Sequence, residues 1–327
     1  MQYRKFGDTG LTVSRLTLGT MTFGLQSEED VSRAIMDEAA DAGVNFIDTA
    51  GVYSLGSGYD LVGRTEEIVG RWLKGKRENF ILATKAVHEM GPLAWQKGAS
   101  RKHLLSAMDA SLKRLGIDYV DLYQLHNDDH DTPLDEMLEA LDTIVKSGKA
   151  RYIGVSNYLA YRLARADVLR TARFISVQPR YNLLFRQIER ELLPLATEEG
   201  LAVIPYNPLA GGLLTGKHRH DAKPSDGRFT KTVGKAGAMY TQRYWHEREF
   251  HSIEQIKEIV APTGRSLAST ALAWVLANPA VTSAIIGASR PDQLDETLAT
   301  VDQPIDPDIK AKLDEATHEY RFGDALR

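Results

Sequence analysis

Short apolar runs alternate with longer amphipathic segments along almost the whole chain. The runs are rich in Ile, Val, Leu and Phe, which is typical of buried strands. Eight such runs are found, at 15–18, 45–47, 80–84, 120–125, 152–155, 174–177, 201–205 and 283–286. Because eight strands that alternate with helices can close into a parallel barrel, we predict an α/β fold, a (β/α)8 TIM barrel.

The amphipathic segments carry helix start and stop signals. We predict helices at 28–41, 66–74, 101–114, 133–146, 158–169, 189–199, 267–277 and 291–297. Ser27 and Ser100 are expected to cap the first and third helices. A glycine follows the end of each of the first four helices, at Gly43, Gly75, Gly116 and Gly148.

Two segments depart from the simple alternation of strands and helices, one at the start of the chain and one before the last strand. Residues 3–6 and 11–14 flank Gly-Asp-Thr-Gly, which predicts an N-terminal hairpin. Residues 207–251 are rich in Gly, Lys, Arg and His, and we predict a long loop there, after the seventh strand and over the carboxyl end of the barrel. No composition shift divides the chain, so residues 1–327 are predicted to form one domain.

Composition excludes several classes of function. The net charge is -4 with a pI near 6.2, which argues against nucleic acid as a partner, because binding its backbone requires a basic surface. The chain has no cysteine, hence no thiolate nucleophile, which suits a cytoplasmic location. No apolar stretch has the length of a membrane span or the features of a secretory signal, so no membrane association is expected.

Four unlike polar side chains stand at the carboxyl ends of predicted strands. Asp48, Lys85 and His126 end or directly follow the second, third and fourth runs, and Tyr53 lies five residues beyond Asp48. This edge carries the chemistry in parallel α/β folds. The four side chains together therefore predict a reaction site.

Several motifs accompany these residues in order along nearly the whole chain. They are NFIDTA at 45–50 with Tyr53, ATK at 83–85, LYQLH at 122–126, IGVSN at 153–157, QP at 178–179 and GASRP at 287–291. With them the chain resembles the aldo-keto reductase superfamily, most closely the bacterial branches that also resemble potassium-channel β subunits. The resemblance implies an NADPH-dependent enzyme that reduces a small-molecule aldehyde or ketone to an alcohol, or catalyses the reverse oxidation.

The resemblance also implies a role for each of the four polar groups. Tyr53 would donate the proton that the reduced oxygen needs. Lys85 would place a cation near the phenol, and Asp48 would hold the ammonium by an ion pair. His126 would hydrogen-bond the substrate carbonyl and position it.

Cofactor-binding positions are carried over in the same way, and they imply NADP(H). Ser156, Asn157 and Gln178 would meet the nicotinamide carboxamide, and Tyr206 would stack on its ring. Ser289 and Arg290 would meet the 2′-phosphate, although Gly287 and Gln293 replace residues that are basic or polar in better-known members. The remaining expected contacts are Thr20, Met21, Asn207, Pro208, Leu209, Gly211, Lys217, Arg228 and Glu296.

Two motifs suggest other kinds of site, a P-loop and a metal site. The run ending in Gly216, Lys217 and His218 nearly spells a P-loop, but His218 replaces the Ser or Thr that would bind Mg²⁺. His126 to Asp131 could ligate a metal, yet no His-x-His stands on the first strand; a solvated acidic loop is favoured, and no metal site is expected.

Two further functions stay open. One is a Schiff-base aldolase that uses Lys85, which is disfavoured because Asp48 would raise the pKa of the amine. The other is a redox-sensing regulatory subunit that keeps NADPH bound and turns over slowly.

Overall fold

The computed structural model describes residues 1–327 except 55–57, 170, 223, 225–226, 231–234 and 324–327. Within these residues eight parallel strands are joined in the order β10-β3-β4-β5-β6-β7-β8-β9. Their bounds are β3 Leu16–Gly19, β4 Phe46–Asp48, β5 Ile81–Ala86, β6 Val120–Leu125, β7 Ala150–Ser156, β8 Phe174–Gln178, β9 Ala202–Val203 and β10 Ala284–Ile286.

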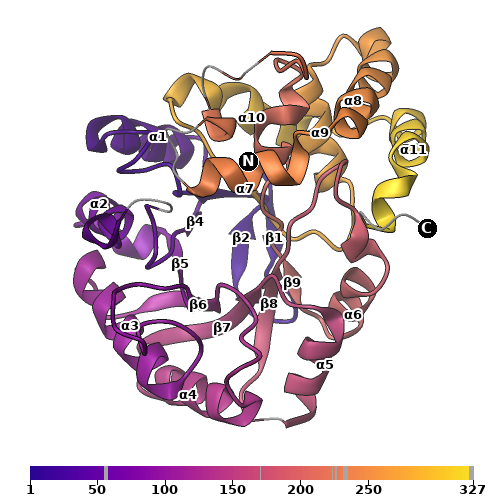
Figure 1. Cartoon of the computed structure of the whole chain (residues 1–327). Helices are drawn as coiled ribbons and strands as arrows, with labels where there is room; N and C mark the ends of the chain where they lie inside the picture. The colour runs from indigo at the N-terminus through magenta and orange to yellow at the C-terminus, as the bar shows by residue number, and fades with distance from the viewer. Residues whose placement is uncertain (55–57, 170, 223, 225–226, 231–234, 324–327) are drawn as a thin grey trace.

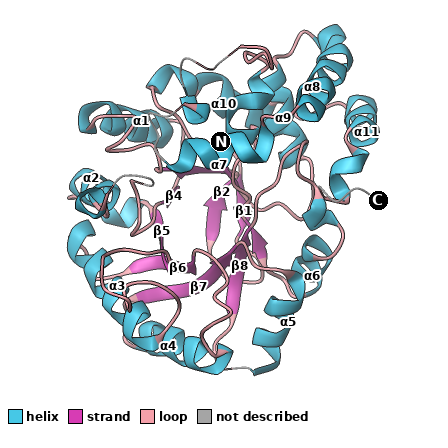
Figure 2. Ribbon diagram, viewed as in Figure 1, coloured by secondary structure: helices cyan, strands magenta, loops and turns pink. Residues whose placement is uncertain are grey.

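The first and last strands of this order also meet. Val203 and Val281 form a parallel bridge, and the Ile285 amide donates to the Pro205 carbonyl at 2.8 Å. The sheet is therefore closed into a barrel, and helices surround it (Figure 2). The predicted (β/α)8 barrel is confirmed, with each predicted strand within a few residues of an observed one.

The helices between the strands also follow the sequence pattern. They are α1 Glu29–Asp41, α2 Arg64–Leu73, α3 Arg101–Leu115, α4 Leu134–Lys146, α5 Ala160–Leu169, α6 Leu192–Glu198, α9 Leu267–Leu276 and α10 Asp295–Ala299. Ser100 caps α3 as predicted, since its side chain accepts from the His103 amide. The Ser27 cap was wrong: Glu28 is the N-cap of α1, and Ser27 Oγ instead donates to the Ser289 carbonyl at 3.1 Å.

The predicted hairpin closes one end of the barrel. Strands β1 Tyr3–Lys5 and β2 Thr12–Ser14 pair antiparallel, and Phe6, which follows β1, and Val13, within β2, are fully buried. The Phe6 ring meets the Phe46 ring edge-on, with centroids 5.6 Å apart. These side chains share an apolar cluster with barrel residues, so the hairpin blocks the amino end. Only the carboxyl end is left for a site.

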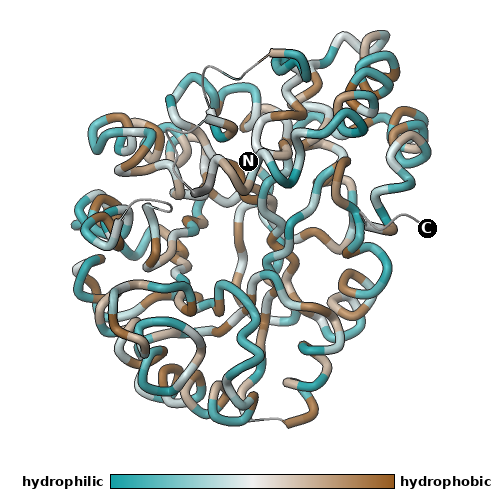
Figure 3. Tube along the Cα trace, in the orientation of Figure 1, coloured by the Kyte–Doolittle hydropathy of each residue, from teal (hydrophilic) through white to brown (hydrophobic). Residues whose placement is uncertain are grey.

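The larger apolar cluster lies between the barrel and the helices. Figure 3 shows brown, apolar stretches along the strands, whereas the outer helices alternate between brown and teal. This is the arrangement that a helix with one buried face requires. The barrel sets where the strands end, and the larger apolar cluster between strands and helices stabilises the barrel.

The predicted 207–251 loop was wrong for much of its length. Its described residues contain two 3-10 turns, Ala210–Thr215 and Gly227–Phe229, the helix α7 Lys235–Tyr244, and the start of α8 Glu247–Val260 (Figure 1). The pattern hid α7 because aromatic contacts anchor it: Tyr240 and Tyr244 of the helix and Phe229 of the second turn are all buried, and the helix packs on both turns. A further helix, α11 Pro307–Ala316, was not predicted.

Candidate active site

An ion pair lies at the centre of the carboxyl end of the barrel. Asp48 ends β4 and Lys85 lies on β5; Lys85 Nζ donates to Asp48 Oδ2 at 2.6 Å and to the Thr49 carbonyl at 2.9 Å. The other carboxylate oxygen, Oδ1, accepts from Gln124 Nε2 at 3.1 Å and Gln178 Nε2 at 2.9 Å. Charge and hydrogen bonds thus hold both oxygens of Asp48 in place.

Burial sets the electrostatics of this pair. The Lys85 side chain is 0% exposed and that of Asp48 is 4% exposed. Burial lowers the pKa of the Lys85 ammonium, and the charge and hydrogen bond of Asp48 oppose that change. A buried ammonium is costly unless it is paired and hydrogen-bonded. The short contacts to Asp48 and Thr49 meet that requirement.

Tyr53 lies beside the ion pair. Its backbone is held by hydrogen bonds from its N–H to Ala50 and from Gly63 to its carbonyl. Lys85 Nζ is 5.2 Å from the centroid of its ring. Burial, and then the charge of Asp48, raise the pKa of the Tyr53 phenol well above its ordinary value, while Arg228 opposes them. The phenol is therefore neutral near pH 7 and carries a proton to donate.

His126 follows β6 and faces Tyr53. The two ring centroids are 5.7 Å apart, with the rings at 76°. The His126 amide donates to the Ala86 carbonyl, and its own carbonyl accepts from Asn157 Nδ2. Burial, and then the nearby His88 and Lys85, hold the pKa of the His126 imidazole well below its usual range. A neutral ring can donate one hydrogen bond and accept another.

The structure thus brings together the four side chains predicted at the strand ends. It adds two that sequence reasoning missed, Gln124 and His88. Gln124 lies on β6, two residues before His126, and the alternation of a strand puts it on the same side as His126, which could have revealed it. Gln178 was expected at the nicotinamide, and here its amide supports Asp48.

A second polar cluster adjoins the first at the ends of β7 and β8. Ser156 Oγ donates to the Gln178 carbonyl at 2.8 Å, and Asn157 Nδ2 donates to Ser156 Oγ at 3.1 Å. The Tyr206 hydroxyl donates to Asn157 Oδ1 at 2.8 Å. Asn157 adopts a left-handed φ of 59°, which asparagine tolerates well. An aromatic ring is therefore fixed next to a group of amide and hydroxyl side chains.

The chain after Tyr206 exposes backbone to this edge. Asn207 Oδ1 accepts from the Gly211 amide at 2.6 Å, and Pro208 and Leu209 complete the turn. Gly211 and Gly212 have φ of 71° and 101°, and a Cβ on Gly212 would meet nothing within 4 Å. Both glycine amides donate within the turn, that of Gly212 to the Leu209 carbonyl at 2.8 Å, so it is the space beside Gly212 that lets a ligand approach this turn closely.

Two basic residues lie in the segment that follows the turn at Gly211 and Gly212. Lys217 is exposed, and Arg228 Nη1 donates to the Tyr240 hydroxyl at 2.6 Å. A Cβ on Gly287 would lie 3.4 Å from Arg228 Nη2. The Arg228 guanidinium therefore reaches the loop that follows β10, although the two residues are far apart in sequence.

That loop carries the remaining predicted contacts. The Ser289 amide and hydroxyl donate to Gln293 Oε1, at 2.8 and 3.2 Å. Arg290 is 62% exposed, with its Nε 3.2 Å from Asp292 Oδ1, and Glu296 is also exposed. On the neighbouring segment, after β3, Thr20 Oγ1 donates to the Asp48 carbonyl, and Met21 is half-buried.

The run that ends at His218 and the acidic loop from His126 to Asp131 both make contacts within the fold. Gly216 ends a 3-10 turn, and the His218 ring packs 5.2 Å from that of Phe229. The acidic loop is not simply solvated: Asp128 is 9% exposed and accepts from Arg162 Nε at 2.9 Å, with His130 3.2 Å away. The ion pair between Asp128 and Arg162 thus gives part of this loop a structural role.

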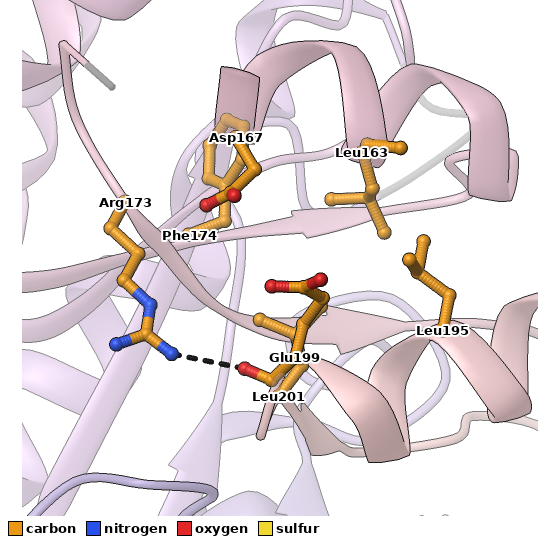
Figure 4. A pocket seen from close by; sticks show the side chains of 8 residues that line it. Leu163, Asp167, Arg173, Phe174, Leu195, Glu199 and Leu201 are labelled. Carbon is orange, nitrogen blue, oxygen red and sulfur yellow. Dashed lines mark hydrogen bonds between the residues drawn. The ribbon is translucent and has the colours of Figure 1, made fainter. Parts of the chain in front are cut away.

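A small pocket, partly open to solvent, lies elsewhere, between α5 and α6 (Figure 4). Arg173 lines it and donates to the Glu199 carbonyl at 2.9 Å. None of the predicted site residues lines this pocket. Within the described part of the chain, every helix is too short or too polar to cross a bilayer.

The chain is similar to known proteins over nearly its whole length. The model of the Aldo/keto reductase family matches residues 15–318. The uncharacterized oxidoreductase YrpG of Bacillus subtilis is 39% identical over 96% of this chain and 95% of its own. A probable voltage-gated potassium channel subunit beta of Arabidopsis thaliana is 38% identical over 92% of each chain. The L-glyceraldehyde 3-phosphate reductase of Escherichia coli K12 is 37% identical over 91% of this chain and 87% of its own.

Proposed function

Since the chain belongs to the aldo/keto reductase family, we propose that it is an oxidoreductase that reduces an aldehyde or ketone to an alcohol with NADPH. The single observation that carries the proposal is the cluster of Tyr53, His126, Lys85 and Asp48 at the open end of the barrel. The same residues can serve the reverse oxidation. We also propose that residues 1–327 act as one domain.

The residues at this edge fit a nicotinamide dinucleotide. Tyr206 and the Ser156–Asn157 amide cluster suit a planar carboxamide ring. The glycine turn of Gly211 and Gly212, flanked by Asn207, Pro208 and Leu209, leaves space beside Gly212 that suits a pyrophosphate. Thr20, Met21, Gln178, Gly287, Gln293 and Glu296 are proposed as further contacts.

The basic residues of the edge favour the phosphorylated form of the cofactor. Arg290 is exposed, and Lys217 and Arg228 lie on the segment that faces the same loop. An arginine fork matches the oxygens of a 2′-phosphate, and Ser289 offers a hydroxyl beside it. We therefore propose NADP(H) as the cofactor.

The roles of the side chains follow from their surroundings. When bound, the cofactor supplies a hydride to the carbonyl carbon. His126, neutral and fixed by Asn157 and Ala86, hydrogen-bonds the carbonyl oxygen and orients it. The neutral Tyr53 phenol donates its proton to that oxygen as negative charge develops.

Lys85 and Asp48 act through Tyr53. The ammonium, 5.2 Å from the ring centroid, stabilises the phenolate that remains after proton transfer. Asp48 anchors the ammonium, and Gln124 and Gln178 anchor Asp48. The Schiff-base alternative requires a free neutral amine, and the ion pair of Lys85 disfavours it.

The regulatory alternative is supported by the relatives named as potassium channel subunits. A regulatory subunit would hold NADPH longer than a turnover takes. Measuring kcat for several aldehydes beside the rate of NADP release separates the two functions. For an enzyme we expect turnover at least as fast as 1 per second, about the lower end of typical kcat values.

Arg290→Ala should weaken NADPH binding by about 1.5 to 3 kcal/mol, the value of a charge-assisted contact to phosphate, and leave NADH binding almost unchanged. Fluorescence titration with both cofactors measures this. Arg101→Ala, which removes an exposed arginine paired with Glu139, is the control. Equal losses for both cofactors would mean that Arg290 does not bind the 2′-phosphate, and a wild-type preference for NADH would refute the choice of NADPH.

The segment from Leu213 to His251 is expected to change its amide hydrogen exchange when NADP binds, and the structure divides it. Tyr240 and Tyr244 are buried, and the Tyr244 hydroxyl accepts from Asn182 and Asn207, so α7 should be protected even without cofactor. Slowing should concentrate at 213–230, around Lys217 and Arg228, whose charges a pyrophosphate neutralises. Unchanged exchange there at saturating NADP would refute the proposal that the cofactor orders this segment.

A further inference from the structure

His88 lies next to His126 in the site and has no role in the scheme above. It follows β5 by two residues, and its ring centroid is 4.3 Å from that of His126, with the rings at 65°. The Ala86 carbonyl accepts from the His126 amide at 3.0 Å, so the two histidines come from neighbouring strand ends. Tyr53, His126 and His88 therefore form a row of rings at the open end of the barrel.

The loop that carries His88 is tied down on both sides. The Gly98 amide donates to the Val87 carbonyl at 2.8 Å, and the Ala99 amide donates to Asp129 Oδ2 at 2.6 Å. The Met90 amide donates to the Gln96 carbonyl at 2.9 Å. The backbone of this loop is thus held before any ligand binds, and Asn127 and the His126 ring contact the His88 ring itself, which is the fixed geometry that a recognition residue requires.

The hydrogen bonds of His88 determine where its proton lies. Asn127 Nδ2 donates to His88 Nε2 at 3.2 Å, so Nε2 is the acceptor. Burial and the charge of Lys85 lower the pKa of His88, so the ring is neutral near pH 7. A neutral imidazole that accepts at Nε2 carries its proton on Nδ1.

That N–H remains available to a ligand. Among the described residues no side chain or carbonyl accepts from His88 Nδ1, and the atom is not one of those shut off from solvent without a partner. An unused donor therefore stands one ring away from His126, the residue assigned to the reacting carbonyl. Adjacent rings match two oxygens on adjacent carbons of one substrate.

We propose that His88 is a specificity-determining residue whose Nδ1–H binds an oxygen on the carbon next to the reacting carbonyl. The inference rests on the proposed carbonyl reduction and narrows its substrates to aldehydes and ketones with a neighbouring hydroxyl or keto oxygen. Simple alkyl aldehydes lack that acceptor and leave the donor unpaired. A site built to hydrogen-bond a polar group discriminates against analogues that lack it.

Lactaldehyde and propionaldehyde test the proposal, because they differ only in the neighbouring hydroxyl. Wild-type enzyme with NADPH should show a kcat/KM for lactaldehyde about 10-fold above that for propionaldehyde, the effect of one neutral hydrogen bond. His88→Phe keeps a ring and removes the donor, so it should abolish this ratio by bringing the kcat/KM for lactaldehyde down to that for propionaldehyde.

Two amide variants separate recognition from a structural effect. The amide nitrogen of His88→Asn lies near the position of Nδ1 and should restore most of the ratio, whereas that of His88→Gln reaches toward Nε2 and should not. Thermal unfolding of each variant checks that it is folded. If His88→Phe does not fold, the comparison of Asn with Gln decides the question.

The outcomes distinguish this inference from the proposed function. Reduction of both aldehydes with equal kcat/KM, an unchanged ratio in His88→Phe, or equal ratios in the Asn and Gln variants would overturn the role of His88 and leave the reductase intact. Failure of the wild-type protein to reduce either aldehyde, or a panel of other carbonyl compounds, would overturn both.

Discussion

Tyr53→Phe is expected to lower kcat for carbonyl reduction by about 10² to 10⁴, the usual contribution of a general acid. The phenol is buried and neutral, and its hydroxyl is the group proposed to reach the substrate oxygen. Phe keeps the edge contact with His126 and the ring beside Lys85. NADPH affinity should stay nearly constant, because the lost interaction forms only in the transition state.

Stopped-flow measurement of NADPH oxidation and a parallel fluorescence titration give the two quantities. Tyr59→Phe, which removes an exposed hydroxyl that contacts Glu89, is the matched control and should keep near-normal rates. A Tyr53→Phe rate within about threefold of wild type, well below the expected loss, would show that Tyr53 is not the proton donor.

Lys85→Met should reduce both activity and stability. Lys85 is fully buried and lies 2.6 Å from Asp48, so its removal leaves a buried carboxylate without its cation. Breaking a buried ion pair from one side costs about 3 to 5 kcal/mol of folding free energy. Activity should fall sharply as well, because the phenolate formed at Tyr53 loses its neighbouring cation.

Asp48→Asn should act in the same direction, and the two changes together should cost much less than their sum. The residues work as a unit, and a neutral Asn beside a Met leaves no unpaired buried charge. Urea unfolding and kcat for the two single variants and the double variant complete the cycle. Additive losses in either quantity would contradict the coupling.

A second ion pair serves as the control for stability. Arg77 lies 2.6 Å from Asp121, with both side chains largely buried and away from the site residues. Arg77→Met should destabilise the fold and leave kcat of the folded enzyme close to wild type. A large fall in its kcat would mean that destabilisation alone explains the loss in Lys85→Met.

The barrel was predictable because its strands are short apolar runs between clear helix signals. The same local reasoning failed at Ser27, whose hydroxyl binds the distant Ser289 carbonyl instead of the end of α1. It failed at α7, where aromatic side chains anchor a segment of polar and glycine-rich composition. In both places contacts between distant segments override the local pattern.

The candidate site shows the same division. Asp48, Lys85 and His126 were predicted because parallel strands end at one edge, which fixes their meeting without any side-chain detail. Gln124 and His88 were missed because their importance depends on hydrogen bonds and ring contacts across strands. The positions of these residues at strand ends predict that they meet at the carboxyl end of the barrel. The folded structure is needed to show which amide side chains and rings contact one another there.

Deuterium transfer tests the central proposal most directly. The protein is incubated with an aldehyde and NADPH that carries deuterium at the transferable C4 position, and the product is analysed by mass spectrometry. Carbonyl reduction predicts an alcohol with one deuterium on the former carbonyl carbon, formed in proportion to NADPH consumed and nearly absent with Tyr53→Phe. An alcohol without deuterium, or NADPH left unconsumed across a broad carbonyl panel, would contradict it.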